Sequence, residues 1–565
     1  MKLLQTYLKK YFWLLIIILS IPAIKSLLVP GFFGASDDLH IAWLYEMDQA
    51  LKIGQIPPRF VPDLSFGFGY PLFNFVFPFP FYIAEIFHFS GFSLVDSIKL
   101  VFLISIPLSG IFMYLLIKKL STSLLALAGA VVYMYAPYRA TDIYIRGAIG
   151  EIISFIFLPL IALSIINIFP GKNNKQNNFR WIAIGGVSIA FLILSHNITA
   201  YMFVPQVLLL VAFLTNKKYF SIKKYLNTIL MFSLGLVISV YFWLPALIES
   251  RLMKYDTVFN FIDHFPTIRQ LFTPYWGYGA SVPGPGDGMS FFLGIVNIAI
   301  MIIAGLALVF YLKKYSFIQK RVLIWTFFII FSSIFLMNHR STVVWDNLPL
   351  IKYFQFPWRF LMATTFAFPL LVIALDKFRL KNLISIVIIA ITLITSKNYF
   401  QPEHFLGRSD EYYINRYIPT PVASTEYYST QEEYLRLPKN TIIRPDKNYP
   451  IASVQPNQEI QINQINSLNS QLIIKADQDI IVDYYKYYYP GWQVLANGNP
   501  VKIYPGEPFG QVSFNLPSGD YEVEIQYQEP VWKIIIDLIS LAGLFTALIL
   551  ILFPIKRLSS FQQVK

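Results

Sequence analysis

Two adjacent carboxylates and an imidazole lie close together near the start of the chain, where SDDLH contains Asp37, Asp38 and His40. A carboxylate on an external loop suits a general base or a ligand of a divalent cation such as Mg²⁺ or Mn²⁺. The apolar residues that follow recur at helical spacing, so Ser36 is predicted to cap a helix with both aspartates in its first turn. That position stabilises carboxylates even without a chemical role. A structural and a catalytic interpretation are therefore both open.

A second group of charged residues occurs in YRATDIYIRGAIGE, which contains Arg139, Asp142, Arg146 and Glu151. Arginine suits a phosphate or pyrophosphate because its guanidinium donates paired, charge-assisted hydrogen bonds. The alternative is that the arginines extend toward the membrane interface and pair with carboxylates of the same loop. Arginines on the external side depart from the usual distribution of positive charge, so an anionic partner is expected.

Other polar residues offer less specific signals. His264 and Arg359 fall in external loops or at the ends of apolar runs, and His196 is interpreted as the cap of a span. No histidine pair has the spacing of a zinc site. The chain has no cysteine, and it contains no phosphate loop, nucleophile elbow or dinucleotide fingerprint, which argues against chemistry driven by a cytoplasmic nucleotide.

The elements that must position these residues are membrane-spanning helices. Of the 565 residues, 56% are hydrophobic and 14% are charged, and the mean hydropathy is +0.53. These values are typical of a polytopic membrane protein, whose spans contact membrane lipids. The net charge of +13 is spread over short clusters between apolar runs, which is the pattern of cytoplasmic loops and excludes a nucleic-acid partner.

Twelve runs are apolar and long enough to be predicted as spans: 11–29, 98–117, 122–137, 151–169, 180–195, 199–215, 227–248, 291–312, 322–338, 360–376, 382–397 and 532–554. A further run, 70–89, is excluded, because counting it would place the basic loops outside and because Pro71, Pro78 and Pro80 interrupt it. It is interpreted as an interfacial segment. Both termini are then cytoplasmic.

Residues 398–531 alternate polar and apolar positions between Pro-Gly, Asn-Gly and Ser-Gly turns, which predicts an extracytoplasmic β-sandwich-like domain. In YYKYYYPGW the tyrosines and Trp492 could stack on sugars, but packing in the domain core is favoured. The predicted organisation is a helical membrane module (1–397) with an external loop (30–97), the β domain (398–531), and a last span with a cytoplasmic tail (532–565).

The order of a first span, a long external loop opening with an acidic pair, many further spans and a β domain resembles the GT-C superfamily of membrane glycosyltransferases. In that superfamily an acidic motif in the first external loop serves catalysis, and the donor is usually a polyprenyl-phosphate sugar. Asp37 and Asp38 match that motif by position and type. Where many members have Lys or His before Pro-Pro-Leu, this chain has Tyr70-Pro71-Leu72, so an arginine would have to supply the missing cation.

Two longer stretches resemble narrower groups. DDLHIAWLYEMDQALKIGQIPPRFVPDLSFGFGYPLFNF and YAPYRATDIYIRGAIGE are similar to bacterial multi-pass proteins with a 6-pyruvoyl-tetrahydropterin-synthase-related domain. YYYPGWQVLANGNPV resembles the C-terminal part of YfhO-like membrane proteins, which are linked to glycosylation of cell-envelope polymers.

These resemblances imply an inverting membrane glycosyltransferase that moves a sugar from a polyprenyl-phosphate donor to a cell-envelope glycan or lipid acceptor. Asp37 or Asp38 would act as general base or hold a metal, and the expected substrate-binding residues are His40, Arg59, Arg139, Arg146, Glu151, His264 and Arg359. The alternative is a non-catalytic scaffold or lipid-linked-glycan binder with the same fold. A polar cavity shared by the aspartates and Arg139 or Arg146 would indicate the enzyme, whereas aspartates tied up in local hydrogen bonds would indicate the scaffold.

Overall fold

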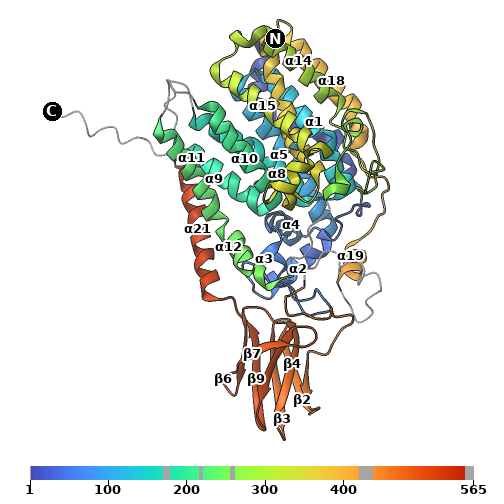
Figure 1. Cartoon of the computed structure of the whole chain (residues 1–565), viewed down its shortest axis with the longest axis vertical. Helices are drawn as coiled ribbons and strands as arrows, with labels where there is room; N and C mark the ends of the chain where they lie inside the picture. The colour runs from blue at the N-terminus through green and yellow to red at the C-terminus, as the bar shows by residue number, and fades with distance from the viewer. Residues whose placement is uncertain (1, 170–177, 216–220, 255–260, 419–436, 554–565) are drawn as a thin grey trace, which may run out of the picture.

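The computed structural model describes residues 2–169, 178–215, 221–254, 261–418 and 437–553. A large helical part and a smaller β domain lie at opposite ends of the long axis, and the short helices of the first loop lie between them (Figure 1). The predicted fold class, a polytopic membrane-helix bundle followed by an antiparallel β domain, is confirmed. The predicted cytoplasmic tail lies outside the described residues, since 554–565 are not among them.

Ten helical segments in the described residues are long and apolar enough to cross a membrane, or eleven if one bent pair counts as a span. They are α1 (Lys2–Ile24, continued by η1, Lys25–Leu28), α5 (Leu94–Leu120), α8 (Ile149–Ile168), α9 (Asn178–Ser195), α10 (Asn197–Leu214), α14 (Ile295–Tyr311, continued by η6, Leu312–Lys314), α15 (Phe317–Leu336), the run of η9 (Pro357–Phe360), α17 (Leu361–Ala367) and η10 (Phe368–Lys377), α18 (Lys381–Ser396, continued by η11, Lys397–Tyr399) and α21 (Val531–Leu552).

All twelve predicted runs fall on helices, but two are not simple spans. The run 122–137 contains α6 (Ser123–Met134), which has only 12 residues. The run 227–248 contains α11 (Ile222–Ile238) and α12 (Val240–Glu249, followed by η4, Ser250–Leu252), which meet at a bend of 69°. The count of twelve spans is therefore ten or eleven by length and composition.

The segment 70–89, which was not predicted to span, forms two short helices, α3 (Leu72–Phe75) and α4 (Phe79–Phe89). Proline explains the break between them, since Pro78 precedes the first turn of α4 and has no N–H to extend α3. The first loop also contains α2 (His40–Lys52), which packs against α4.

The remaining short helices lie in loops between the spans. They are α7 (Pro137–Thr141), a π-helical turn η2 (Asp142–Arg146), η5 (Phe261–His264), α13 (Ile268–Phe272), η7 (His339–Ser341), α16 (Thr342–Asn347), η8 (Ile351–Phe354) and α19 (Asp410–Tyr417).

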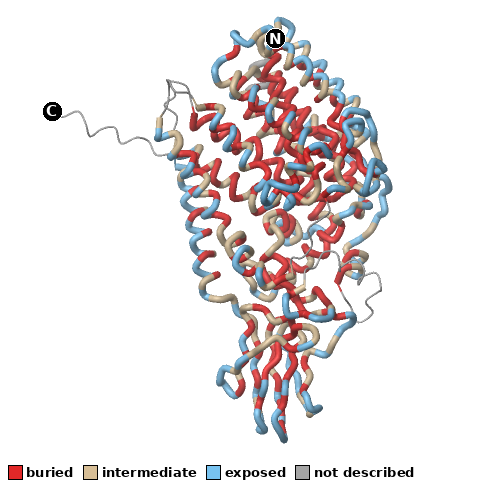
Figure 2. Tube along the Cα trace, viewed as in Figure 1, coloured by how far each residue is buried: buried red, intermediate tan, exposed pale blue. Residues whose placement is uncertain are grey.

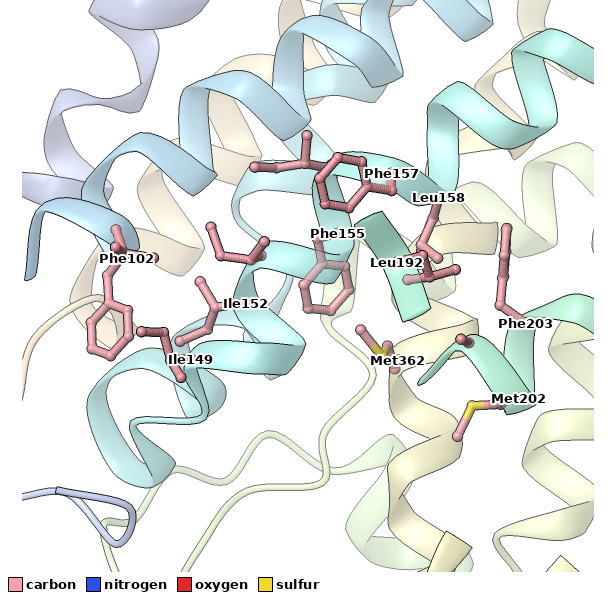
Figure 3. Packing of buried hydrophobic residues seen from close by; sticks show 14 of the residues in the cluster. Phe102, Ile149, Ile152, Phe155, Phe157, Leu158, Leu192, Met202, Phe203 and Met362 are labelled. Atoms are coloured by element: carbon pink, nitrogen blue, oxygen red, sulfur yellow. The ribbon is translucent and has the colours of Figure 1, made fainter. Parts of the chain in front are cut away.

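The centre of the bundle is α8, which is apolar on every side. In its apolar stretch 94% of the residues are buried. A helix that is hydrophobic all round must be enclosed by others, and α8 packs against both α5 and α9. Figure 2 shows the buried residues concentrated in this region, and Figure 3 shows Phe155 and Ile152 of α8 close to Phe102 of α5 and Leu192 of α9. This rigid core fixes the first turn of α8, where Glu151 lies.

The β domain consists of two antiparallel sheets, with strand orders β1-β4-β8-β7 and β2-β3-β9-β5-β6. The strands are β1 (Ala452–Gln455), β2 (Ile460–Asn466), β3 (Asn469–Ala476), β4 (Ile480–Tyr487), β5 (Trp492–Ala496), β6 (Asn499–Pro500), β7 (Ile503–Gly506), β8 (Gln511–Leu516) and β9 (Gly519–Tyr527). Tyr484 links the sheets, because its hydroxyl lies 3.1 Å from Ser470 Oγ and its ring packs on Trp492. Trp492 is 5% exposed, so it belongs to the core, as favoured from the sequence.

The β domain is attached to the first loop by buried contacts. Tyr487 Oη lies 2.7 Å from Ser65 Oγ, and Lys486 Nζ donates to the carbonyl oxygen of Gly67 at 2.6 Å. The Phe60 ring packs against Trp492. The first loop is therefore held between the helical bundle and the β domain.

Candidate active site

The acidic pair lies in the turn that precedes α2, rather than in its first turn. The predicted cap is wrong, because no side chain caps α2 and the Ser36 hydroxyl donates to the Ile145 carbonyl instead. The backbone N–H of Ser36 donates to Ile145 O at 3.0 Å, and that of Asp37 donates to Arg146 O at 2.7 Å. The acidic turn, Ser36–Leu39, is thus joined by its main chain to the arginine loop, Tyr138–Gly147.

His40 and Gly147 extend this junction. His40 Nδ1 lies 3.1 Å from the Gly147 carbonyl oxygen. Because a carbonyl only accepts, Nδ1 carries the proton and Nε2 is left as an acceptor. Burial lowers the pKa of His40 and favours this neutral form. Gly147 has φ +69°, and a Cβ there would lie 3.1 Å from the Ala35 Cβ, so glycine suits both the turn and the close approach.

A cavity of about 240 Å³ opens where the acidic turn, the arginine loop and the ends of three spans meet. Its polar wall contains Asp37, His40, Arg146, Glu151, His196, Gln355 and Arg359. Its apolar wall includes Trp43 of α2 with Phe75 and Phe77 of the first loop. Five of the predicted site residues therefore share one cavity, although they are separated by more than 300 residues in the sequence, from Asp37 to Arg359.

Glu151 holds the two arginines of the cavity. Its carboxylate accepts from Arg146 Nη2 at 2.9 Å and from the Tyr138 hydroxyl at 2.8 Å, and its Oε1 lies 3.5 Å from Arg359 Nε. Asp142 accepts from Arg146 Nη1 at 2.6 Å. Burial of Asp142 and the nearby Glu151 raise the pKa of the Asp142 carboxyl. The carboxylates fix the orientation of the guanidinium groups and offset part of their positive charge.

The two histidines of the cavity present opposite hydrogen-bonding character. His196 precedes α10, and its Nδ1 accepts from the Thr199 backbone N–H at 3.2 Å. In the neutral ring the proton is then on Nε2, which is a donor, whereas His40 Nε2 is an acceptor. A hydroxyl group both donates and accepts, so this pair fits a hydroxyl-rich ligand.

Asp38 differs from its neighbour. It is 6% exposed and accepts a hydrogen bond from the Tyr417 hydroxyl of α19. Burial raises the pKa of the Asp38 carboxyl, and the Tyr417 hydrogen bond and nearby Arg416 oppose that shift. Asp37, by contrast, lines the cavity, so the two carboxylates have separate surroundings.

That divergence does not fit a shared metal ion. Among the described residues no group of three or more His, Asp or Glu side chains is arranged to hold a metal. Asp38 is engaged by Tyr417, and two guanidinium groups occupy the cavity wall near Asp37. The Mg²⁺ or Mn²⁺ site considered for Asp37 and Asp38 is therefore not supported by the donor set that these residues offer.

Arg59 and Arg139, two of the predicted substrate-binding residues, do not line this cavity. Arg59 Nη2 lies 2.5 Å from Asp537 Oδ1 on α21. Arg139 is 1% exposed, donates to Ser109 Oγ at 2.8 Å, and places its guanidinium 4.5 Å from the Phe155 ring centre. Arg139 is therefore part of the bundle interior, and Arg59 belongs to the contact with the last span.

His264 is also separate from the cavity, since its Nδ1 lies 2.9 Å from Ser281 Oγ within the loop between α12 and α14. Conversely, His196 was interpreted only as a cap, and Gln355 was not singled out. His196 does cap a helix, at the start of α10, but it lines the cavity as well. Its place in the short turn SHN, which was predicted to be external, is the signal that could have indicated a site residue.

A comparison with protein-family models finds no match for this chain. An uncharacterized protein of Lactococcus lactis subsp. cremoris (strain MG1363) is 28% identical over 225 residues, which are 37% of this chain and 35% of that protein. The chain thus spans about a third of the length of the curated relative that it matches.

Three solved structures show partial similarity at low sequence identity. The arabinofuranosyltransferase AftD from Mycobacteria is 13% identical with a TM-score of 0.46, over 75% of this chain and 30% of that chain. The apo oligosaccharyltransferase of Archaeoglobus fulgidus is 15% identical with a TM-score of 0.41, over 78% and 62%. The oligosaccharyltransferase AglB of Archaeoglobus fulgidus, in complex with an inhibitory peptide and a dolichol-phosphate, is 15% identical with a TM-score of 0.40, over 78% and 62%.

Proposed function

We propose that this chain is an integral membrane glycosyltransferase that transfers a sugar from a polyprenyl-phosphate donor to a cell-envelope acceptor. The observation that carries the proposal is the cavity that Asp37 shares with Arg146 and Arg359. A carboxylate supplies a base for a hydroxyl group, and two guanidinium groups supply a binding site for a phosphate. The resemblance of the acidic pair to the first-loop motif of the GT-C superfamily agrees with this assignment.

The reaction follows from these roles. The acceptor hydroxyl oxygen attacks the anomeric carbon of the donor sugar, and its proton passes to the Asp37 carboxylate. The bond between the anomeric carbon and the phosphate oxygen breaks, and the electron pair leaves with the polyprenyl phosphate. Arg146 and Arg359 stabilise the charge that develops on that phosphate. Attack opposite the leaving group inverts the anomeric configuration.

The histidines and the aromatic wall suit the transferred sugar. His40 Nε2 accepts and His196 Nε2 donates, so the two rings are able to orient neighbouring sugar hydroxyls. The wall formed by Trp43, Phe75 and Phe77 offers an apolar surface for a sugar face. Glu151 contributes as a positioning residue, because it holds Arg146 and Arg359 rather than the substrate.

In this proposal both termini are cytoplasmic, and the cavity and the β domain face the outer side. The basic loops between the spans support that orientation through the positive-inside rule. The acceptor then belongs to the outer face of the membrane. The β domain, which is fixed to the first loop by Lys486 and Tyr487, would border the entrance for that acceptor.

A non-catalytic scaffold or lipid-linked-glycan binder is the alternative, and one observation favours it. Asp38 is held by Tyr417, as expected for a carboxylate with a structural role. Asp37 separates the two hypotheses, because a binder needs the arginines but no base.

Substitution of each aspartate tests the proposal. Asp37→Asn preserves size and removes the base, so we expect the transfer rate to fall by about a hundredfold or more. Asp38→Asn is the matched control, because its amide oxygen still accepts from Tyr417, and we expect less than about a tenfold change. The measurement is sugar transfer from radiolabelled polyprenyl-phosphate sugars to envelope extracts, with purified protein in vesicles.

Undiminished transfer by Asp37→Asn would reject the assignment of the base. If both variants bind the donor and the parent protein itself transfers no sugar, the result would support the non-catalytic binder instead. Misfolding is excluded as the cause if the purified variants elute from a size-exclusion column at the same volume as the parent protein and have the same Tm.

A further inference from the structure

A second and larger cavity lies between the first loop and the last span. It is a groove of about 870 Å³ formed by α4, α9, α12, α21 and residues 54–57, within the usual range of about 300–1,000 Å³ for ligand sites. It is distinct from the proposed active-site cavity, with which it shares no lining residue. Figure 1 shows α21 leaning along α11 and α12 at the edge of the molecule.

One face of α21 forms the membrane side of this groove. Its lining residues are Ile534, Asp537, Leu538, Ser540, Leu541 and Leu544, which recur at helical spacing. Leu538 is 61% exposed and Ile534 is 48% exposed although both line a cavity, so the groove is open toward the hydrocarbon that surrounds α21. From Ile534 to Leu544 the face extends about 15 Å, half of the hydrocarbon thickness of about 30 Å. That length matches the chains of a lipid in one leaflet.

The outer end of the groove is polar but has no cation. Its polar lining is Gln55, Tyr82, Tyr241, Tyr527, Glu529 and Asp537, and no Lys or Arg is among the described lining residues. The nearby cations, Arg59 and Lys533, pair with these carboxylates and do not line the groove. Arg59 forms a bidentate contact with Asp537, with N–O distances of 2.5 and 3.2 Å, and Lys533 Nζ lies 3.4 Å from Glu529 Oε2.

The chemistry of this end differs from that of the active-site cavity. The carboxylates repel a phosphate but accept hydrogen bonds from sugar hydroxyls. The phenol hydroxyls donate and accept hydrogen bonds with sugar hydroxyls, and the tyrosine rings offer faces for sugar stacking. The active-site cavity instead presents Arg146 and Arg359 to its ligand. An acidic residue within a membrane span, such as Asp537, also marks a functional site more often than a purely structural one.

The segment Phe77–Phe79 connects the two cavities. Phe77 lines the active-site cavity and Phe79 lines the groove, where its ring stacks on Phe191 of α9 with a centroid distance of 4.3 Å. The wall of the groove and the wall of the proposed donor site therefore meet at this segment.

We propose that this groove binds the acceptor, and that the acceptor is a membrane lipid with an uncharged, hydroxyl-rich sugar headgroup. The inference rests on the proposed function and names its acceptor class. The lipid enters sideways from the outer leaflet along the exposed face of α21. Its sugar contacts Tyr241, Tyr527 and Glu529, while its chains lie against Leu538, Leu541 and Leu544.

Photo-crosslinking tests the occupant. The probes are a diazirine-labelled monohexosyl diacylglycerol, a diazirine-labelled phosphatidylglycerol and a diazirine-labelled polyprenyl phosphate, each incubated with the full chain in vesicles. We expect the hexosyl lipid to label peptides of α21 and α4, and unlabelled hexosyl lipid to compete for that labelling. Phosphatidylglycerol is expected not to compete at equal concentration.

Leu538→Trp fills the groove and should lower hexosyl-lipid labelling about tenfold. Phe545→Trp is the matched control, because Phe545 is an exposed apolar residue of α21 that does not line the groove. Equal labelling of both variants would overturn the inference. Preferential labelling of the groove by polyprenyl phosphate would overturn it too, because the groove would then hold the donor chain.

This experiment is independent of turnover. If Asp37→Asn keeps full transfer activity while hexosyl-lipid labelling persists, the assigned base fails and the lipid site stands. If Asp37→Asn abolishes transfer while the groove is not labelled by the hexosyl lipid, the acceptor inference alone fails.

Discussion

At the scale of single residues, the site depends on carboxylates that hold arginines. Glu151 lies in the first turn of α8 and is 1% exposed, and three donors converge on it from different segments. Arg359 Nε is buried and faces Glu151 Oε1 at 3.5 Å without a hydrogen bond between them, so this ion pair holds the guanidinium through charge.

Glu151→Gln should therefore destabilise the protein strongly. It leaves Arg146 and Arg359 buried with one less carboxylate, and breaking such an ion pair costs about 3–5 kcal/mol. Asp96→Asn is the control. Asp96 is half-exposed at the start of α5 and pairs with Lys99 at 3.0 Å, but Lys99 also donates to the carbonyls of Val29 and Gly31, so we expect a loss of about 1 kcal/mol or less. Thermal unfolding in detergent measures both, and equal Tm shifts would contradict the role given to Glu151.

The residue types of the site were predictable, but their grouping was only partly so. Asp37, His40, Arg146, Glu151 and Arg359 were all selected from the sequence and share a cavity. The local rule for helix capping failed at Ser36, because its partner is 109 residues away and the rule considers only the helix that follows. Arg139 looked equivalent to Arg146 in the same loop, yet π-helical geometry at 142–146 gives them different surroundings.

At the scale of elements, the short helix α19 connects the acidic turn with the bundle. Tyr417 at its end donates to Asp38, and Asp410 at its start accepts from the backbone N–H groups of Leu94 and Val95, both at 2.8 Å. Asp410 thus caps α5 from more than 300 residues away. No local signal in the sequence indicates this contact, whereas apolar runs long enough to cross a membrane are visible locally.

The contact between α2 and α4 makes stability depend on pH. Both carboxylate oxygens of Glu85 on α4 are buried without hydrogen-bond partners among the described residues. Burial, and the negative charge of Asp48 on α2, raise the pKa of Glu85 to about 7 from its usual 4.5. The folded state therefore favours the protonated form of Glu85. Its contribution to the free energy of unfolding is complete below the pKa of the unfolded state, and it is lost as the pH rises through about 7.

Glu85→Gln should remove this loss of stability at rising pH. We expect the Tm of the parent protein to fall between about pH 5 and about pH 8 and that of the variant to fall less, because glutamine stays neutral. Glu411→Gln, at an exposed position on α19, should follow the parent profile. A variant that keeps the parent's full pH dependence would show that Glu85 is not the responsible group.

At the scale of the whole molecule, the first loop is the joint between the bundle and the β domain. Lys486 is its clearest anchor, since Nζ donates to Gly67 O at 2.6 Å and to Pro62 O at 3.1 Å. Burial lowers the pKa of Lys486 to about 8, and Asp63 and Glu46 oppose that shift. The overall layout of spans followed by a β domain was predictable from composition, but the docking was not, because contacts between distant segments leave no local pattern.

Lys486→Met should loosen this joint without unfolding either part. It removes two buried hydrogen bonds but keeps an apolar stem of similar length, so we expect faster hydrogen–deuterium exchange in residues 60–70 and in β4. Lys475→Met, at an exposed position on β3, is the control and should leave exchange unchanged. If exchange in both segments matches the parent protein, Lys486 does not fix the domain.

The main-chain junction between the acidic turn and the arginine loop also affects how such a site could diversify. Hydrogen bonds from the backbone of Ser36 and Asp37 do not depend on side-chain identity, and only proline, which lacks an N–H, is incompatible with donating them. Mutation of the surrounding wall should therefore leave the distance between Asp37 and the arginine loop unchanged. Randomised libraries at Leu39, Phe75 and Ile198 would alter the shape of the cavity while the junction stays in register. Under the proposed function, we expect such libraries to change the preferred sugar while the placement of Asp37 and the arginines is kept.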